Sequence, residues 1–161
     1  MNYRTILASA AVACLIASPA FAKADKAFLR DAIQGDNSEI ALGKLAAQKG
    51  DSEGVKTFGT TLATDHAMAK EAAATVATSM KVRVTDKIMP EARAELRKLN
   101  KLSGPAFDRE FARYMVRDHE KDVAEFKEKA AEGKTDVAKL AAKTLPGLEG
   151  HLKTAQSLTK S

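Results

Sequence analysis

The chain has 161 residues, a length that predicts a single domain, with 26 Lys and Arg residues against 21 Asp and Glu residues and a formal net charge of +5. Aromatic residues make up 5% of the sequence, there is no Trp, and the basic residues are dispersed among acidic ones. This composition argues against a nucleic-acid-binding protein, whose surface needs clustered basic residues and stacking aromatics.

The first 22 residues have the pattern of a secretory signal peptide. Arg4 supplies a short positive region, an apolar run too short to span a bilayer follows, and Ala20-Phe21-Ala22 is a small-x-small cleavage site. We therefore expect cleavage after Ala22 and a mature domain of residues 23–161 in the periplasm. Its sequence would lack Cys14, the only cysteine, and with it any disulfide or thiolate metal site. No other apolar run is long enough to be a transmembrane anchor.

The remaining sequence is rich in Ala, Lys, Glu and Leu, which favour helices, and its Gly and Pro residues lie between periodic segments. We predict four long helices, with Ser52 as the N-cap of the second and Thr135 or Asp136 as that of the fourth. Pro146 should kink or divide the fourth helix. The predicted helices span residues 25–49, 53–80, 105–132 and 136–159, with a short helix at 90–102 inside the connection 81–104.

Apolar residues recur along each long helix at spacings of three and four, which gives the stripe that a bundle buries. Many of these positions are Ala or Gly, so we expect the helices to approach closely. The sequence therefore predicts an all-α fold, an antiparallel four-helix bundle with a short extra helix between the second and third long helices. The stripe of the first helix is Phe28, Ala32, Gly35, Glu39, Leu42 and Ala46.

Four polar residues interrupt the stripes, one in each long helix: Glu39, His66, His119 and His151. They include all three histidines of the chain, and each lies near the middle of its helix. With a rise of about 1.5 Å per residue, mid-helix side chains of neighbouring helices fall at similar heights in either orientation. We predict that the three imidazoles and the Glu39 carboxylate turn inward and meet at one level, with Leu152 competing with His151 for the inward direction.

Three aspartates lie close to these histidines in the sequence. Asp65 and Asp118 each precede a histidine by one residue, so they point about 100° away from it around the helix. We expect them to bond a histidine of a neighbouring helix, and Asp122 to support the site in the same way without binding an ion itself. The two helices also share a pattern, in which Phe58, Leu62, Asp65 and His66 have the spacing of Phe111, Met115, Asp118 and His119.

Polar groups buried without partners are costly, so the four inward residues need something to satisfy them. One hypothesis is a single transition-metal ion, since three imidazoles and one carboxylate suit zinc, iron, copper or manganese. The alternative is a neutral network in which each imidazole bonds a carboxylate or a carbonyl without a metal. The sequence leaves both open. It shows no nucleophile elbow or phosphate loop, so we identify no catalytic residues and no organic cofactor, and the sequence does not decide whether the protein is an enzyme, although a binding protein is favoured.

The chain resembles the domain of unknown function 4142 (DUF4142) family of exported bacterial proteins, which are grouped with ferritin-like bundles. The resemblance covers about residues 25–158 and implies a ferritin-like four-helix fold in the periplasm or envelope. The family is named for lacking a known activity, so the resemblance assigns none. The residues that carry it are Glu39-Ile40-Ala41-Leu42-Gly43-Lys44-Leu45-Ala46, Val55-Lys56-x-Phe58, Asp65-His66, Phe107-Asp108, Met115, His119 and Leu145-Pro146-x-Leu148-x2-His151-Leu152.

The wider ferritin-like group often binds two irons through Glu residues and Glu-x-x-His motifs. In this chain Ala63, Val116 and Leu148 stand three residues before the histidines, and only His119 has an acid, Asp122, three residues after it. This departure disfavours a redox enzyme of the di-iron type.

We therefore expect an exported bundle that binds one transition-metal ion for storage, sensing or structure. The alternative is a structural or stress-related envelope protein that binds no metal, and the di-iron enzyme comes third. The partners we consider are the metal ion, a second copy of the chain and another envelope protein, and we expect neither nucleic acid nor a membrane anchor.

Overall fold

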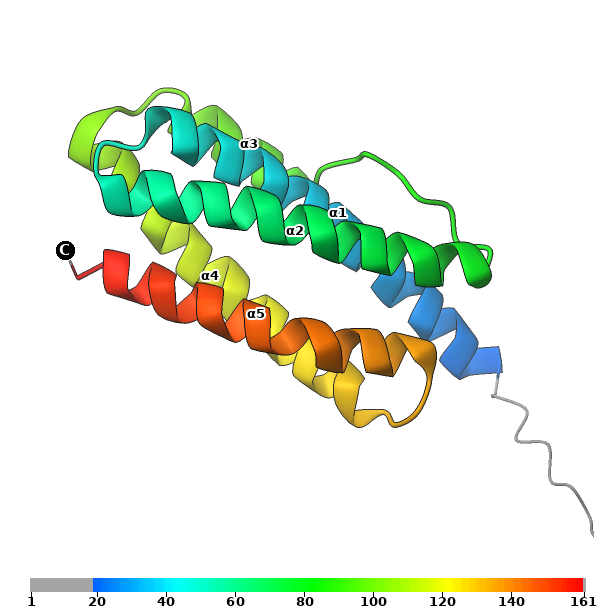
Figure 1. Cartoon of the computed structure of the whole chain (residues 1–161). Helices are drawn as coiled ribbons and strands as arrows, with labels where there is room; N and C mark the ends of the chain where they lie inside the picture. Colours follow the sequence, from blue (N-terminus) through cyan, green and yellow to red (C-terminus); the bar gives the residue numbers. More distant parts are fainter. Residues whose placement is uncertain (1–18, 161) are drawn as a thin grey trace, which may run out of the picture.

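The computed structural model describes the backbone of residues 19–160 and the side chains of residues 23–160. The predicted signal peptide, including Cys14, lies outside the described residues except for the helical backbone of residues 19–22. The described chain contains five helices and no strand. The helices are α1 (Pro19–Lys49), α2 (Glu53–Ser79), α3 (Pro90–Leu99), α4 (Gly104–Ala131) and α5 (Asp136–Leu158) (Figure 1). None of these helices combines the length and the apolar character needed to cross a membrane.

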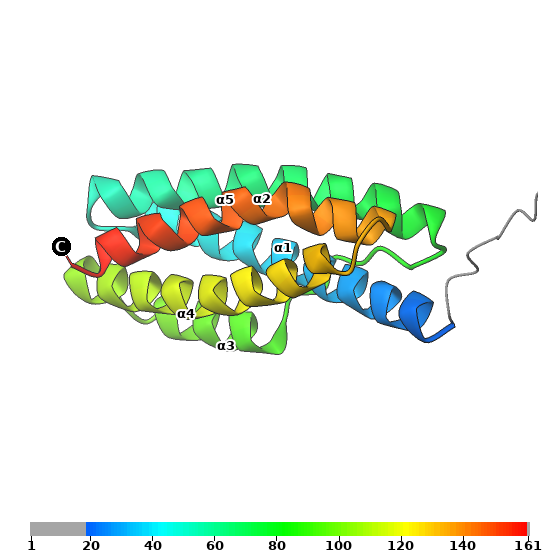
Figure 2. The same ribbon diagram turned by 90° about the horizontal axis from the view of Figure 1, so that it is seen from below.

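The four long helices form two antiparallel hairpins, α1 with α2 and α4 with α5 (Figure 1). The hairpins pack against each other mainly through α2 and α5. A long connection after α2 leads the chain back along the bundle, so that α4 begins at the same end as α2 (Figure 2). The short helix α3 lies in this connection and packs against α1 and α4. The fold is the predicted ferritin-like antiparallel four-helix bundle with one extra helix.

The helix ends follow local capping chemistry. Ser52 Oγ accepts a hydrogen bond from the Val55 amide at 3.3 Å, and Thr135 Oγ1 accepts one from the Ala138 amide at 3.1 Å, which identifies Thr135 as the N-cap of α5. The short helix α3 ends at Leu99, before the expected residue 102, because the Lys101 and Leu102 amides bond carbonyls three residues back and so tighten the last turn.

Two helix limits differ from the sequence prediction. Helix α1 begins at Pro19, earlier than the expected residue 25, because Pro suits a first turn and the Ala residues after it favour helix. Helix α5 continues through Pro146, so the expected division of this helix is wrong. Pro146 leaves the Ala142 carbonyl without its helical donor, but both residues are exposed and water can take the donor's place.

Small residues let α1 and α2 approach closely, as predicted. A Cβ atom added at Gly43 would lie 2.6 Å from the Gly59 carbonyl oxygen, and one added at Gly59 would lie 2.6 Å from the Gly43 carbonyl oxygen. Real Cβ atoms do not approach backbone so closely, so any larger residue at either position would force the helices apart. This contact lies about one turn from Glu39 and fixes α1 against α2 near the middle of the bundle.

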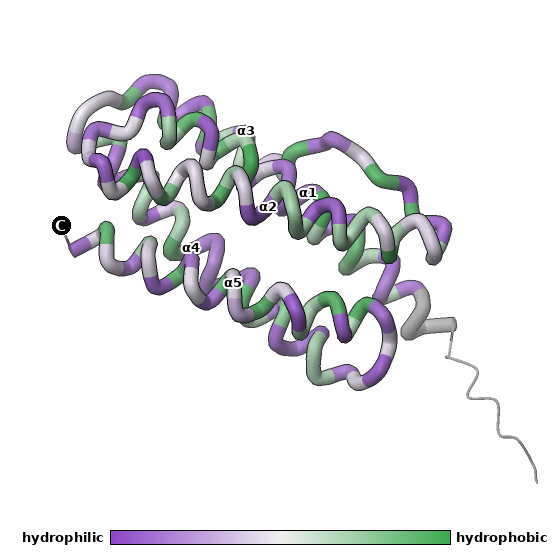
Figure 3. Tube along the Cα trace, in the orientation of Figure 1, coloured by the Kyte–Doolittle hydropathy of each residue, from purple (hydrophilic) through white to green (hydrophobic). Residues whose placement is uncertain are grey.

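The core consists of two apolar clusters separated by polar residues, and polar and apolar positions are interspersed along each helix (Figure 3). The larger apolar cluster includes Leu42, Phe58, Leu62, Phe111 and Met115. The smaller apolar cluster includes Leu29, Ile33, Ala73, Val137 and Leu140. Between them lies what we call the polar layer, formed by Asp36, Glu39, His66, His119 and His151.

The buried stripe of α1 differs from the predicted one in its first half. Leu29 and Ile33 are fully buried, whereas Phe28 and Ala32 are only half-buried. The Phe28 ring lies to the side of the core, where its centroid is 4.9 Å from that of Phe126. From Glu39 onward the predicted phase is correct. The stripe is therefore offset by one residue on the N-terminal side of the polar layer.

Candidate metal centre

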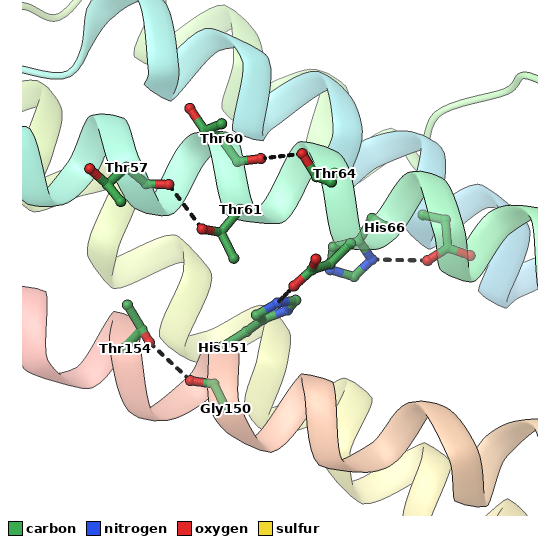
Figure 4. A network of polar contacts seen from close by, with 10 residues as sticks. Thr57, Thr60, Thr61, Thr64, His66, Gly150, His151 and Thr154 are labelled. Carbon is green, nitrogen blue, oxygen red and sulfur yellow. Dashed lines mark hydrogen bonds and ion pairs between the residues drawn. The ribbon is translucent and has the colours of Figure 1, made fainter.

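The three histidines converge in the middle of the bundle, as predicted. His66 comes from α2, His119 from α4 and His151 from α5, and all three are buried. One ring nitrogen of each lies within 4.8 Å of those of the other two, and the ring centroids are 5.3–5.8 Å apart. The rings of His66 and His151 lie close together between α2 and α5 (Figure 4). Across residues 23–160, no other three His, Cys, Asp or Glu side chains form such a group.

Helical periodicity explains why these rings point inward. On α2, His66 lies four residues after Leu62 and eight after Phe58, so all three share one buried face. On α5, His151 lies between the buried residues Leu148 and Ala155 at spacings of three and four. Leu152 is only half-buried, so His151 takes the inward direction for which the two residues competed.

Each imidazole uses one nitrogen for a hydrogen-bond contact within the protein and has no partner for the other. The contacts join His66 Nδ1 to Asp36 Oδ1 at 2.9 Å, His119 Nδ1 to the Met115 carbonyl oxygen at 3.1 Å, and His151 Nε2 to Asp65 Oδ2 at 2.9 Å. The opposite nitrogens are buried without a hydrogen-bond partner, and they are His66 Nε2, His119 Nε2 and His151 Nδ1. Threonines near the site, such as Thr61 and Thr154, bond carbonyls of their own helices and do not satisfy these nitrogens (Figure 4).

The protonation of the site favours metal binding. A carbonyl oxygen can only accept, so His119 Nδ1 carries the hydrogen and Nε2 presents a lone pair. Burial, followed by the neighbouring imidazoles of His66 and His151, lowers the pKa of His119 to about 3. Burial and then His151 lower the pKa of His66 to about 3 as well. Both rings are therefore neutral at neutral pH, which is the form that binds a metal ion.

Glu39 is buried at the same level but stands apart from the three nitrogens. Its side chain is 1% exposed, neither carboxyl oxygen has a hydrogen-bond partner, and no carboxylate joins the histidine group within 4.8 Å. Burial raises the pKa of Glu39 well above its usual range, and the nearby Asp118 carboxyl and the charges of Asp122 and Asp36 raise it further. Of the four ligands predicted from the sequence, the structure thus brings three together.

The aspartates take different places around the site. Asp65 bonds His151 of a neighbouring helix, as expected from its direction on α2. Asp118 and Asp122 instead line a pocket beside the site. Asp36, which sequence reasoning did not single out, is buried against His66. The signal that could have found Asp36 is its position three residues before Glu39, on the same face of α1.

The pocket has a volume of about 380 Å³ and is bordered by all five helices, with α2 contributing His66. His66 and Asp36 form part of its wall, so the pocket reaches the histidine site. Burial and then the Asp118 charge raise the pKa of Asp122 to about 7, while Lys121 lowers it. Burial likewise raises the pKa of Asp36 to about 8, against the opposing charge of Lys70.

The three nitrogens are close enough to bind one ion after a small movement. Metal–nitrogen bonds of about 2.0–2.1 Å with tetrahedral angles place the nitrogens about 3.4 Å apart. One ring nitrogen of each histidine lies within 4.8 Å of those of the other two. Each pair of nitrogens would therefore have to approach by about 1.4 Å at most to bind one ion. Three protein ligands also leave a fourth position open for water or another ligand.

Comparison with known proteins agrees with the fold. The family described as "Domain of unknown function (DUF4142)" matches residues 11–158. No curated protein matches the chain. Among solved structures, the chain is similar to the "Crystal structure of DUF305 fragment from Deinococcus radiodurans", with a TM-score of 0.74 and 18% sequence identity over 84% of this chain and 95% of that chain. At this identity the similarity concerns the helical bundle fold alone.

Proposed function

This chain belongs to the DUF4142 family, whose description names no activity, and from the site itself we propose that it binds one transition-metal ion through His66, His119 and His151. The observation that carries this proposal is the set of three buried ring nitrogens, one from each histidine, that have no hydrogen-bond partner. Each ring makes the kind of contact that the neutral network considered from the sequence requires, to a carboxylate or a carbonyl, but these contacts leave the opposite nitrogen of each ring without a partner. A metal ion satisfies all three at once.

The ligand chemistry favours a transition metal over magnesium or calcium. Neutral imidazole suits zinc, copper and iron, whereas magnesium and calcium prefer oxygen ligands. The contacts of Asp36 with His66 and of Asp65 with His151 are of the kind that orient metal-binding imidazoles in other proteins. With three protein ligands and an open fourth position, the site fits an ion that is exchanged or used better than a closed structural ion.

The test is metal binding by the mature chain, residues 23–161, after treatment with a chelator. We expect about one equivalent of Zn²⁺ or Cu²⁺ to bind and to raise the melting temperature. At a free-ion concentration of about 100 times Kd the gain is about 2.7 kcal/mol, or about 5–10 °C for a domain of this size. The Cu²⁺ form should show coupling to three nitrogen nuclei in its electron paramagnetic resonance spectrum.

Two variants make the test specific. His119→Leu removes one ligand and should abolish stoichiometric binding, whereas Glu120→Gln changes an exposed neighbour on α4 and should bind as the parent does. Less than about a tenth of an equivalent of each candidate ion, with no change in melting temperature, would contradict the proposal. Unchanged binding by His119→Leu would contradict it equally. In either case the alternative hypothesis would remain, namely a structural or stress-related envelope protein that binds no metal.

We also propose that the protein is exported and resides in the periplasm. The support is the sequence pattern of residues 1–22, with its cleavage site at Ala20-Phe21-Ala22. The measurement is N-terminal sequencing of the protein recovered from a periplasmic extract, where the first residue should be Lys23. Recovery of the uncleaved chain from the cytoplasm alone would show that the segment does not direct export.

A further inference from the structure

The outward surface of α3 and of the first half of α4 carries a concentration of positive charge, which we call the basic face. Helix α3 packs beside α4, and Lys98 of α3 forms an ion pair with Glu110 of α4 (Figure 2). Between residues 90 and 117, seven exposed residues are basic and one, Glu91, is acidic. The basic face consists of Arg93, Arg97, Lys98 and Lys101 on or just after α3 and of Arg109, Arg113 and Arg117 on α4.

Helical spacing gathers these residues on one side of each segment. Basic residues recur four apart along both segments, and residues at this spacing are neighbours on a helix surface. The two series are Arg93, Arg97 and Lys101, and Arg109, Arg113 and Arg117. Glu110 lies between the two series, since a hydrogen bond from Lys98 and the charge of Arg113 lower its pKa against the effect of burial. The two helices therefore present one continuous basic surface.

The other acidic residues of the same stretch are buried or bonded within the fold. Glu95 is buried, and Glu110 is half-buried in its ion pair with Lys98. Asp108 accepts two backbone amide hydrogen bonds, both at 2.8 Å, from the segment between α1 and α2. The sequence of this stretch mixes both signs of charge, whereas the surface that it forms is almost entirely positive.

The arginines of the basic face have no anionic partner within the protein. Across residues 23–160, the ion pairs are formed by lysines and histidines, and no arginine takes part in one. Like charges four residues apart destabilise a helix. A guanidinium group can donate two hydrogen bonds at once to a phosphate or a carboxylate. These uncompensated groups therefore indicate an anionic partner outside the chain.

We propose that the basic face binds the surface of a membrane that contains anionic phospholipids. Each Lys or Arg near such a surface adds to the electrostatic attraction, and the phosphate groups of the lipids accept hydrogen bonds from arginine. Arg109 and Arg117 are separated by about 12 Å along α4. The charge is thus spread over an exposed surface of two helices, as contact with a layer of headgroups requires.

The uncharged side chains of this region favour lipid over other anionic partners. Surfaces that bind nucleic acids combine positive charge with aromatic rings for stacking, but the aromatic residues of α4 between 104 and 117 are all buried. Protein interfaces depend on aromatic or apolar anchors. Within residues 23–160, the exposed large hydrophobic residues are Met68 and Val84, and both lie outside the basic face. Binding to headgroups needs only the positive charge.

The basic face is separate from the proposed metal centre. None of its residues belongs to the polar layer or lines the pocket beside the histidines. The inference therefore goes beyond the proposed function, and it is tested with protein that has been treated with a chelator. Failure of the histidine site to bind a metal ion does not affect the result.

The experiment measures sedimentation of the mature chain, residues 23–161, with lipid vesicles. We expect binding to vesicles that contain phosphatidylglycerol and none to vesicles of phosphatidylcholine alone. Binding should fall at least about tenfold when the salt concentration rises from about 0.05 M to about 0.5 M, because salt screens the attraction.

Matched variants locate the binding surface. Arg97→Gln combined with Arg113→Gln removes one charge from each segment and should weaken binding at least about tenfold. Arg97→Lys combined with Arg113→Lys keeps both charges and should keep binding within about twofold. The control combines Arg30→Gln with Arg83→Gln, which removes the same net charge at exposed positions outside the basic face. It should bind as the parent does.

Several results would overturn the inference. They are no binding to phosphatidylglycerol vesicles at low salt, equal binding to both kinds of vesicle, and an equal loss in the control and in the Arg97→Gln, Arg113→Gln variant. Tighter binding to duplex DNA than to the vesicles would also overturn it, as would self-association of the parent that this variant abolishes. Circular dichroism checks that each variant is folded, and Arg93→Gln combined with Arg109→Gln is a second pair that should lose binding in the same way.

Discussion

The larger apolar cluster and the polar layer are neighbouring parts of one core, yet their residues are satisfied in different ways. Phe58 and Phe111 are almost completely buried and pack edge to face, with ring centroids 6.1 Å apart, and they need no ligand. His119 and Glu39 are buried to the same degree but keep polar atoms without partners. The difference indicates that the cluster stabilises the fold, whereas the unpartnered atoms of the polar layer lower the stability of the metal-free protein.

The largest expected effect comes from breaking the cluster. Phe111→Ala should lower the free energy of unfolding of the metal-free protein by about 3–5 kcal/mol, because the lost ring leaves a cavity among rigid helices. Urea denaturation of the parent and the variant measures the change. The folded fraction should still bind one equivalent of Zn²⁺, since the three histidines are untouched. A variant that keeps its stability but loses Zn²⁺ would show that the two regions do not divide their roles in this way.

The second prediction concerns the residue that orients His66. Asp36→Ala should weaken Zn²⁺ binding by about 10–100-fold, because loss of a buried hydrogen-bond partner of a metal-binding imidazole typically has this effect. Competition with a coloured chelator measures the affinity. Asp31→Ala serves as the control, since Asp31 is an exposed aspartate five residues before Asp36 on α1. Equal Zn²⁺ affinities for the two variants would show that Asp36 does not support Zn²⁺ binding.

Sequence periodicity was enough to predict the fold and the meeting of the histidines, since His66 and His119 occupy core positions of regular helices. It did not predict Asp36, because the stripe of α1 is offset by one residue before the polar layer, with Leu29 and Ile33 in the core. It also did not predict that Glu39 lies among carboxylates and apart from the imidazoles. That separation depends on how α1 and α4 pack against each other, and the spacing of residues within one helix does not predict how two helices pack.

The pH dependence of stability distinguishes the two kinds of buried group in the metal-free protein. Burial raises the pKa of Asp36 to about 8 and that of Asp122 to about 7, so the folded state keeps protons that the unfolded chain loses near pH 4. These groups lower stability as the pH rises through that range. Burial lowers the pKa of His66 and His119 to about 3, so these groups raise stability from pH 3 to their ordinary pKa of 6.5. Above pH 6.5 only the carboxyl effect continues.

We therefore expect the metal-free protein to lose stability between pH 6.5 and 8, by about 1.4 kcal/mol per pH unit for each proton released. Glu39, whose pKa is also raised, contributes to this slope, and Glu39→Gln should flatten it by up to one proton. Urea denaturation at several pH values between 5 and 8 measures the slope in both proteins. Equal slopes would mean that Glu39 is ionised in the folded protein throughout this range, as it is in the unfolded chain, so that its pKa is not raised. A steeper slope in the variant would reverse the assigned sign.

The smallest effect is expected for the aspartate that contacts His151. Asp65 makes the same type of contact as Asp36, at the same distance of 2.9 Å, but its side chain is 42% exposed against 10% for Asp36. Water can replace an exposed carboxylate as partner of the ring N–H, whereas it reaches the buried Asp36 position less readily. Asp65→Ala should therefore weaken Zn²⁺ binding by only a few-fold, or about 1 kcal/mol or less. The same chelator competition measures it beside Asp36→Ala, and a larger loss for Asp65→Ala than for Asp36→Ala would show that burial does not set the importance of these partners.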